Sequence, residues 1–318
     1  MWSKIKLFLD KKDVKLSPKR YFIDAMSAMA MGLFASLLIS TIFDTVASKT
    51  GWDWLASVAD YASAASGMAM AVAIGSALGA PPLVLFSLCA VGACSNTLGG
   101  PLGTLFCAIF GCELGKLVSK ETKVDIIVTP TVTILSGCAL ASLIGPGISA
   151  IMTGFGQLVM MATELQPFWM GILVSVIVGI VLTLPISSAA LCASLGATGL
   201  IGPAGGAATA GCCAQMIGFA VMSFRENRWG GLVAQGLGTS MLQIGNICRN
   251  PWIWLPPTLA SAITGPIGVM SAESFGGALD WIGLLLVCIV LPGVLTWLIA
   301  IPMRKFGLIK EGDTKLNL

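Results

Sequence analysis

Long stretches without charged residues alternate along this chain with short charged segments. The charge-free windows are residues 25–43, 61–112, 126–163, 165–224, 229–248, 250–272 and 281–303. One helical crossing of a bilayer needs about 20 apolar residues, so these windows hold at most roughly eleven crossings. We therefore expect an all-α fold, a polytopic membrane helix bundle with about ten transmembrane helices.

Glycine and proline break the apolar windows at four places, namely Gly79–Pro82, Gly99–Pro101, Leu184–Ser188 and Gly202–Gly206. Proline removes a backbone donor, and the adjoining glycine permits a turn. Open backbone survives at membrane depth only where it is buried in protein or lines a cavity. Segments 82–99 and 186–203 are therefore candidate re-entrant hairpins. The alternative is a set of ordinary kinked helices joined by short loops.

A shift of 104 residues aligns two segments of the chain. Small and helix-breaking residues of the two segments then coincide in the same order. The aligned residues are Gly67, Gly75, Pro81 and Gly92 in the first segment and Gly171, Gly179, Pro185 and Gly196 in the second. Ordered matches of this kind predict an internal two-fold repeat, the plan of many transporters, which bind substrate at the repeat interface. The repeat can be parallel or inverted.

These patterns predict five segments. Residues 1–20 form an amphipathic lead at the cytoplasmic face, and residues 21–60 form a first transmembrane helix and an acidic external loop over 44–60. Residues 61–165 form the first membrane repeat, residues 166–303 the second, and residues 304–318 a cytoplasmic tail.

The amino-acid composition excludes several classes of function. Only 10% of residues are charged, against about 25% in soluble domains, which excludes a soluble enzyme. Histidine is absent, which excludes His-based triads, phosphohistidine relays and His-ligated metals. We expect no cofactor. The ten cysteines show no paired C-x-x-C spacing; they suit helix packing, with a redox or metal role as the alternative.

The charge balance predicts orientation. The net charge is +3, and lysine and arginine are concentrated in the first twenty residues and after residue 303. Such clusters mark the cytoplasmic side, so both termini are expected in the cytoplasm and the number of crossings is expected to be even. The basic start directly abuts a membrane segment, which disfavours nucleic-acid binding.

Polar residues inside the apolar windows are the candidate substrate-binding groups. Glu113 and Gln215 occupy equivalent positions of the two repeats and would converge on one central site. A carboxylate accepts hydrogen bonds and an amide both donates and accepts, which suits hydroxyl recognition. The alternative for Glu113 is a cytoplasmic helix end neutralised by Lys116.

A second candidate set lies in residues 229–248. Gln235, Thr239, Gln243 and Asn246 follow steps of 4, 4 and 3, which places them on one face of a continuous helix. This stripe would line a hydrophilic pathway; the alternative is interhelical hydrogen bonding that holds the bundle or a dimer.

The hairpin breaks carry a third set, Asn96, Ser187 and Ser188. Their amide and hydroxyl groups could bind a neutral ligand, or the hydroxyls could satisfy their own helix carbonyls. The polar residues of all three sets are nearly uncharged. This favours a neutral polyhydroxylated solute and disfavours an ion channel, which needs rings of charge.

Several longer motifs resemble a known family. They are KRYFIDAM at 19–26, APPLVLF at 80–86, GKLVSKETKVDIIVTP at 115–130, PISSAA at 185–190, GCCAQM at 211–216 and AQGLGTSMLQ at 234–243. Together they resemble the bacterial phosphotransferase-system sugar transporter subunit IIC, more narrowly the stand-alone EIIC-like branch that includes a cytolysin regulator. The resemblance extends over nearly the whole chain.

The resemblance implies a homodimeric permease subunit in the bacterial cell membrane. Its sugar would be phosphorylated by a separate IIB protein that is charged in turn by IIA. Enzymatic activity would then belong to the assembled system, because no phosphoryl-accepting residue is evident in this chain. Several sugar-specific members use a binding-site histidine, which this chain lacks. An alternative is therefore a ligand-sensing membrane regulator, or a transporter not coupled to phosphorylation.

Overall fold

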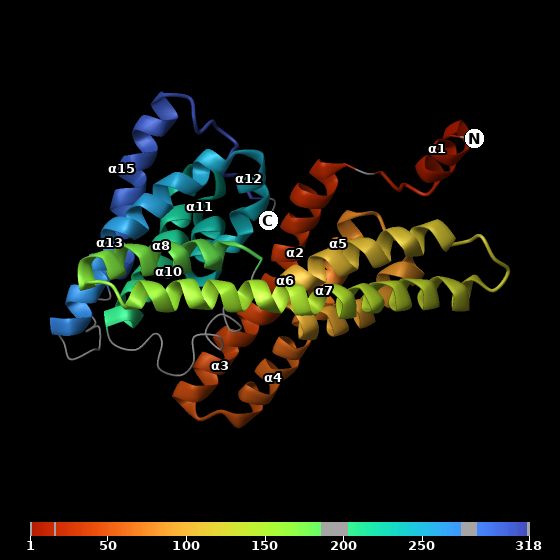
Figure 1. Cartoon of the computed structure of the whole chain (residues 1–318), viewed down its shortest axis with the longest axis horizontal. Helices are drawn as coiled ribbons and strands as arrows, with labels where there is room; N and C mark the ends of the chain where they lie inside the picture. Colours follow the sequence, from red (N-terminus) through yellow and green to blue (C-terminus); the bar gives the residue numbers. More distant parts are fainter. Residues whose placement is uncertain (1, 16, 186–202, 275–284, 317–318) are drawn as a thin grey trace. The chain divides into compact units, whose positions relative to one another are not determined.

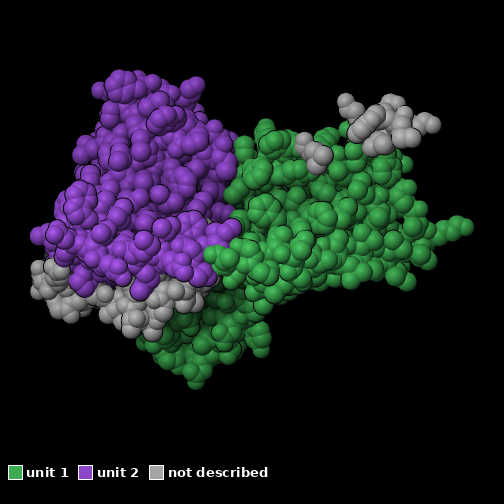
Figure 2. All heavy atoms as spheres, viewed as in Figure 1, with its two compact units in different colours: residues 1–150 green, residues 151–318 purple. Residues whose placement is uncertain are grey.

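A computed structural model describes residues 2–15, 17–185, 203–274 and 285–316. Every regular element in these ranges is helical, and none of the residues described is in a strand, which confirms the all-α prediction. The chain divides into two compact units, unit 1 with residues Met1–Ala150 and unit 2 with Ile151–Leu318 (Figure 2). The internal repeat over 61–165 and 166–303 stays a prediction.

Unit 1 begins with the short helix α1 (Trp2–Lys11), at the predicted amphipathic lead. One long helical run follows, made of η1 (Arg20–Asp24), α2 (Ala25–Leu33), η2 (Phe34–Leu38) and α3 (Ile39–Thr50). The remaining helices are α4 (Asp53–Ala64), α5 (Ser66–Ala77), α6 (Pro82–Val118) and α7 (Asp125–Thr163) (Figure 1). The last of these continues past residue 150 into unit 2.

The stretch 44–60, predicted as an external loop, is mostly helical, and its external location stays a prediction. Helix α3 continues to Thr50 and ends where Gly51 adopts a left-handed conformation, with φ 71° and ψ 26°. Helix α4 then begins at Asp53, an acidic residue in the first turn, where the helix dipole favours negative charge. Polar composition alone therefore does not indicate a loop here.

The Pro82–Val118 segment, α6, is a helical hairpin with two antiparallel arms. Gly100 has φ 60° and ψ −158°, a conformation outside the helical region, and Pro101 begins the second arm. The hydroxyls of Ser95 and Thr104 lie 3.3 Å apart, whereas a straight helix would separate these residues by about 13 Å. A Cβ built on Gly115 would lie 3.0 Å from a Val84 methyl group, near the two open ends of the hairpin. The hairpin thus extends over 82–118 with its turn at Gly100, whereas the predicted re-entrant hairpin within 82–99 is wrong, because that segment is one uninterrupted helical arm.

Glycines allow the hairpin to pack closely against its neighbours. A Cβ built on Gly67 of α5 would lie 2.6 Å from the Asn96 Cβ, closer than real atoms approach. On the other side, a Cβ on Gly145 of α7 would lie 3.2 Å from the Leu98 Cβ. Small residues permit such close backbone approach between helices in membranes, so α5, α6 and α7 form one tightly packed group.

Unit 2 contains α8 (Pro167–Thr183) and α10 (Pro203–Met222), both beginning at a proline. The next segment is irregular, with α11 (Phe224–Val233), η3 (Ala234–Gly238), η4 (Ser240–Gln243), α12 (Ile244–Arg249) and η5 (Pro251–Trp254). Two apolar helical stretches complete the unit, α13 (Leu255–Ser274), then η6 (Leu286–Val290) followed by α15 (Leu291–Lys305). The predicted second hairpin, 186–203, lies outside the described residues except for its last position.

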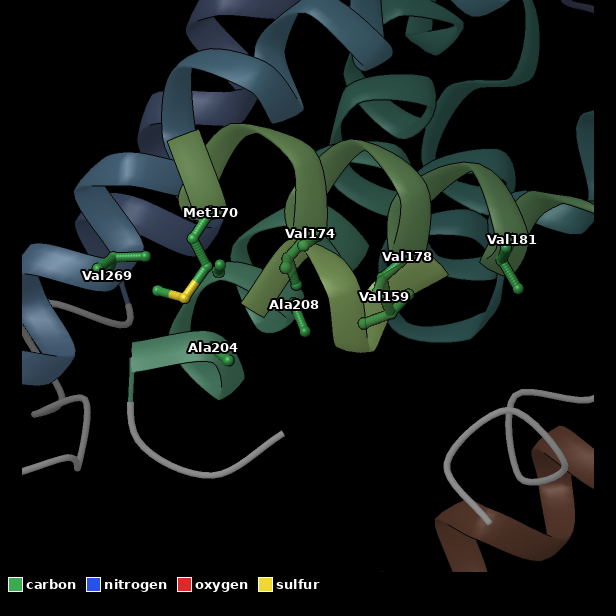
Figure 3. Packing of buried hydrophobic residues seen from close by; sticks show 10 residues of the cluster. Val159, Met170, Val174, Val178, Val181, Ala204, Ala208 and Val269 are labelled. Carbon is green, nitrogen blue, oxygen red and sulfur yellow. The ribbon is translucent and has the colours of Figure 1, made fainter. Parts of the chain in front are cut away.

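The core of unit 2 forms around one face of α8. Met170, Val174, Val178 and Val181 follow helical spacing and are buried against α7, α10 and α13 (Figure 3). A Cβ built on Gly171 would lie 2.7 Å from Pro266 of α13, so α8 and α13 approach at backbone distance. As in unit 1, glycine positions determine where the helices touch.

Six helical segments are long and apolar enough to cross a membrane, or up to seven if the bent pair α4 and α5 is one span. The pair bends by 46° at a short break. These numbers cover the described parts of the chain alone, and the expected ten crossings are not confirmed.

The hairpin can be tested by a disulfide. We expect the double variant Ser95→Cys, Thr104→Cys to form an intrachain disulfide under mild oxidation, because the two hydroxyl oxygens lie 3.3 Å apart. Peptide mapping by mass spectrometry would detect the cross-link.

The matched control pairs Ser87→Cys with Thr104→Cys, using a buried serine two turns earlier on the same arm. A disulfide needs Cα atoms within about 7 Å, so the control pair should stay reduced. Equal cross-linking in the two double variants would contradict the hairpin.

Candidate functional site

The tip of the α6 hairpin brings polar groups together beside a helix break. Ser95 and Thr104 face each other from the two arms and are both fully buried. The Thr104 hydroxyl donates to the carbonyl of Gly100 at 3.1 Å, where the helix is interrupted. Asn96 is half-buried, and its amide nitrogen approaches the Ser66 hydroxyl of α5 at 3.4 Å. The tip thus presents an amide and hydroxyls without any charged side chain.

Glu113 lies on the second arm of the hairpin, near its open end. Its carboxylate accepts a hydrogen bond from the Tyr21 hydroxyl at 3.2 Å and forms an ion pair with Lys116 at 3.2 Å. The Lys116 side chain is 1% exposed and the Glu113 side chain 12%. The ion pair with Lys116, part of the alternative that the sequence left open, is therefore present, and a role of Glu113 in binding a substrate stays a prediction.

Lys116 also closes the helix break before α6. Its ammonium donates to the carbonyl of Leu78 at 2.9 Å and to that of Asp13 at 2.7 Å. Arg20 binds the same two residues, donating to the Asp13 carbonyl at 2.8 Å and to the Leu78 carbonyl. Its guanidinium also pairs with the Asp13 carboxylate and holds the pKa of that group below its usual value. Two cations thus connect the N-terminal segment to the ends of α5 and α6.

Gln215, the predicted counterpart of Glu113, is fully buried in α10 of unit 2. Its amide nitrogen donates to the Thr258 hydroxyl at 3.2 Å, and its carbonyl oxygen accepts from Thr183 at 3.5 Å. Thr183 in turn lies 2.9 Å from the Ser240 hydroxyl. Gln215 therefore connects α8, α10 and α13. Glu113 and Gln215 belong to different units and have separate partners.

The polar stripe predicted over 235–246 does not lie on one continuous helix. Thr239 has an extended backbone, with φ −155° and ψ 140°, and its hydroxyl accepts from the amide of Met241. The chain is a π-helix before this residue and a 3-10 helix after it. Flanking glycines Gly236 and Gly238 weaken the helix here, which is the physical reason for the error.

The break nevertheless brings the three amides of the stripe together. Gln243 donates to the Gln235 carbonyl oxygen at 2.9 Å, and Asn246 donates to the Gln243 carbonyl oxygen at 2.8 Å. Gln235 donates to the Ser223 hydroxyl at 2.9 Å. We call these four residues, Ser223, Gln235, Gln243 and Asn246, the amide ladder. All four are buried.

The C-terminal tail binds along the amide ladder. Gln243 donates to the Thr314 carbonyl at 3.0 Å, and Asn246 donates to the Lys315 carbonyl at 2.9 Å. Asn227 of α11 donates to the Thr314 carbonyl and accepts from the amide of Leu316, both at 2.8 Å. The ladder amides therefore recognise the peptide backbone of the tail. Ser187 and Ser188 lie outside the described residues.

A family model described as phosphotransferase system, EIIC, matches residues 23–285, well over half of the chain. The chain belongs to the phosphotransferase-system EIIC family. No curated protein and no solved structure gives a match. With its apolar helices, this EIIC protein is a multi-pass membrane protein and a permease-type component of that system.

Two structural features of this EIIC protein were not predicted from the sequence, namely the burial of Lys116 and the binding of the tail to the amide ladder. Lys116 has a signal, since a lone lysine at i+3 from a glutamate at the end of a long apolar window is a candidate for burial. The tail has no comparable signal, because residues 310–316 read as an ordinary solvated end. Its partners become visible only once the helix break at Thr239 is known.

We expect Lys116→Met to lower the stability of the protein. The change leaves Glu113 without its ion-pair partner and removes a donor from two carbonyls, and breaking a buried pair costs about 3–5 kcal/mol. The loss of stability would be measured by thermal unfolding in detergent. Lys123→Met, at an exposed lysine after the same arm, is the control; equal losses would refute the role of Lys116.

The amide ladder predicts that Gln243→Ala destabilises unit 2. Gln235, Asn246 and Thr314 each lose a hydrogen bond, and a buried polar group without a partner costs about 1–3 kcal/mol. The unfolding temperature should fall, and proteolysis should cleave the tail faster. Gln157→Ala, at an exposed glutamine, should change neither. A tail equally protected in both variants would contradict the ladder.

Proposed function

We propose that this chain is the membrane permease subunit, IIC, of a sugar phosphotransferase system, and that it binds and translocates a neutral polar solute such as a sugar. The tip of the α6 hairpin is the observation that supports this most directly. An interrupted helix with amide and hydroxyl groups at its turn is the arrangement from which many transporters build a substrate site.

The chemistry of the tip favours hydroxyl groups. Asn96 offers a donor and an acceptor, and its contact with Ser66 at 3.4 Å is long enough for a ligand to replace it. Residues 61–112 contain no charged side chain, so a charged solute would find no counter-charge there. A sugar, which hydrogen-bonds in both directions, fits such a site.

The wider assembly is part of the same proposal. If the two-fold repeat holds, Ser187 and Ser188 near the second break would be the counterparts of the first tip, and Glu113 and Gln215 would border the site from the two repeats. Separate IIA and IIB proteins would meet the cytoplasmic face, with both termini on that side. The working form would be a homodimer.

A second candidate function is a membrane regulator that senses a ligand, or a transporter not coupled to phosphorylation. It is favoured by the state of Glu113, whose carboxylate is bonded to Tyr21 and paired with Lys116. A carboxylate held in this way is a poor base for the hydroxyl that would accept a phosphoryl group. The chain would then bind the solute without assisting its phosphorylation.

Vesicles containing the purified protein, the general phosphotransferase proteins and candidate IIB partners are expected to accumulate a phosphorylated sugar from a broad panel. Binding is measured separately by thermal stabilisation, since a ligand that binds the folded state raises its stability. Stabilisation without phosphorylation would favour the regulator or uncoupled transporter. If no sugar in the panel produced either stabilisation or phosphorylation, both functions would be refuted.

The site is tested by Asn96→Ala. Losing a ligand hydrogen bond should raise the half-saturating sugar concentration by about three- to tenfold, the equivalent of one ordinary hydrogen bond. Thr97→Ala is the matched control, because Thr97 is exposed on the same turn and donates only to its own helix at Ala93. If the two variants bound the sugar with equal affinity, the substrate site would not lie at the hairpin tip.

A further inference from the structure

A long groove runs along one face of α15 in unit 2. Its wide part is a cavity of about 640 Å³, lined by apolar residues of α10, α11, η3, η6 and α15. A second cavity of about 610 Å³ shares the lining residues Val221, Leu232 and Trp297 with the first, so the two lie next to each other along the groove. Helix α10 packs against both α11 and α15 and contributes Ile217 and Val221 to the lining of the first cavity; the three helices are labelled in Figure 1.

The two ends of the groove differ in polarity. On η6 and α15 the lining residues Val290, Val294, Trp297, Ile301 and Arg304 follow a helical stripe with three- and four-residue steps. The apolar part of this stripe, Val290 to Ile301, extends over roughly 18 Å of helix, and the stripe then ends in an arginine. The first cavity has no charged lining residue, and the second has two, Arg225 and Arg304.

The charged end carries an excess of positive charge. Arg304 donates to the Met222 carbonyl at 2.9 Å and approaches Glu226 at 3.9 Å. Arg225 is exposed, and within the described residues no ion pair neutralises it. Two guanidinium groups against one carboxylate leave one net positive charge at the mouth of an apolar groove.

We propose that this groove binds an anionic phospholipid, with an acyl chain along α15 and the phosphate between Arg225 and Arg304. The guanidinium fork matches phosphate oxygens in geometry, and a phosphodiester carries the single negative charge that the site lacks. The apolar stripe of roughly 18 Å exceeds half of the roughly 30 Å hydrocarbon core, so it accommodates the chain of one leaflet. Basic pockets between membrane helices select anionic headgroups in this way.

The proposal is independent of the sugar site, because the groove lies in unit 2 and shares no residue with the hairpin tip. A substitution at Gly293 can block lipid binding in the groove. A Cβ built on Gly293 would lie 3.4 Å from methyl groups of Ile217 and Val221, which is ordinary contact. Gly293→Leu should therefore fold and place its larger side chain in the groove, whereas Gly293→Ala should leave most of the space open.

The test measures thermal unfolding of the purified full chain in detergent micelles doped with phosphatidylglycerol, with phosphatidylcholine or with soluble glycerol phosphate. We expect phosphatidylglycerol alone to stabilise the protein and to be retained in native mass spectrometry. Arg225→Gln should raise the phosphatidylglycerol fraction needed for half-maximal stabilisation about tenfold, the factor expected for one lost charge-assisted hydrogen bond. Gly293→Leu should abolish the effect.

Lys305→Gln is the matched control. It removes one exposed positive charge beside Arg304 that does not line the groove, and it should leave the effect of phosphatidylglycerol unchanged. Equal stabilisation by phosphatidylcholine would overturn the proposal in favour of an unselective apolar groove. The proposal would also be overturned if Arg225→Gln and Lys305→Gln lost the stabilisation by phosphatidylglycerol equally, or if glycerol phosphate alone stabilised the protein. A dimer that buries Trp297 and excludes lipid would overturn it as well.

Discussion

Backbone groups opened at helix breaks must find partners within the chain, and the rest of this structure depends on that constraint. Lipid offers no hydrogen bonds, so each freed carbonyl needs a donor from the protein. The carbonyl of Leu78, before the hairpin, is satisfied by two cations, Arg20 and Lys116. That of Gly100, at the tip, is satisfied by Thr104. At both breaks, side chains of the protein therefore bond the carbonyls that the interrupted helix leaves free.

Glycine has two different roles in satisfying this constraint. At Gly100 it supplies a backbone conformation that a residue with a Cβ rarely adopts. At Gly67 and Gly171 it supplies space, because a neighbouring helix lies where a side chain would stand. The first role makes the hairpin turn, and the second lets helices associate through close backbone contact, which replaces the hydrophobic driving force that is missing in lipid.

The sequence predicted the helical membrane class and the break at Gly99–Pro101, because charge-free length and Gly-Pro breaks act locally. It placed a hairpin within 82–99, where the structure has one arm of a hairpin that extends over 82–118. It predicted a loop over 44–60 wrongly, since acidic and Trp residues also suit helix ends. It selected the amides Gln235, Gln243 and Asn246 but assumed one straight helix. Gln243 and Asn246 also bind the tail, about seventy residues later, and such long-range pairing leaves no periodic trace in the sequence. Whether Asn96 contacts a solute stays a prediction.

The amide ladder has a consequence for the order in which the chain can mature. Its amides enter the membrane early, yet two of their acceptors are the carbonyls of Thr314 and Lys315. A chain is made from its N-terminus, so Gln243 and Asn246 lack these two acceptors until residues 314 and 315 have been synthesised. The ladder can therefore close only after this segment has left the ribosome, and a nascent chain stalled earlier would expose polar amides that quality-control proteases can recognise.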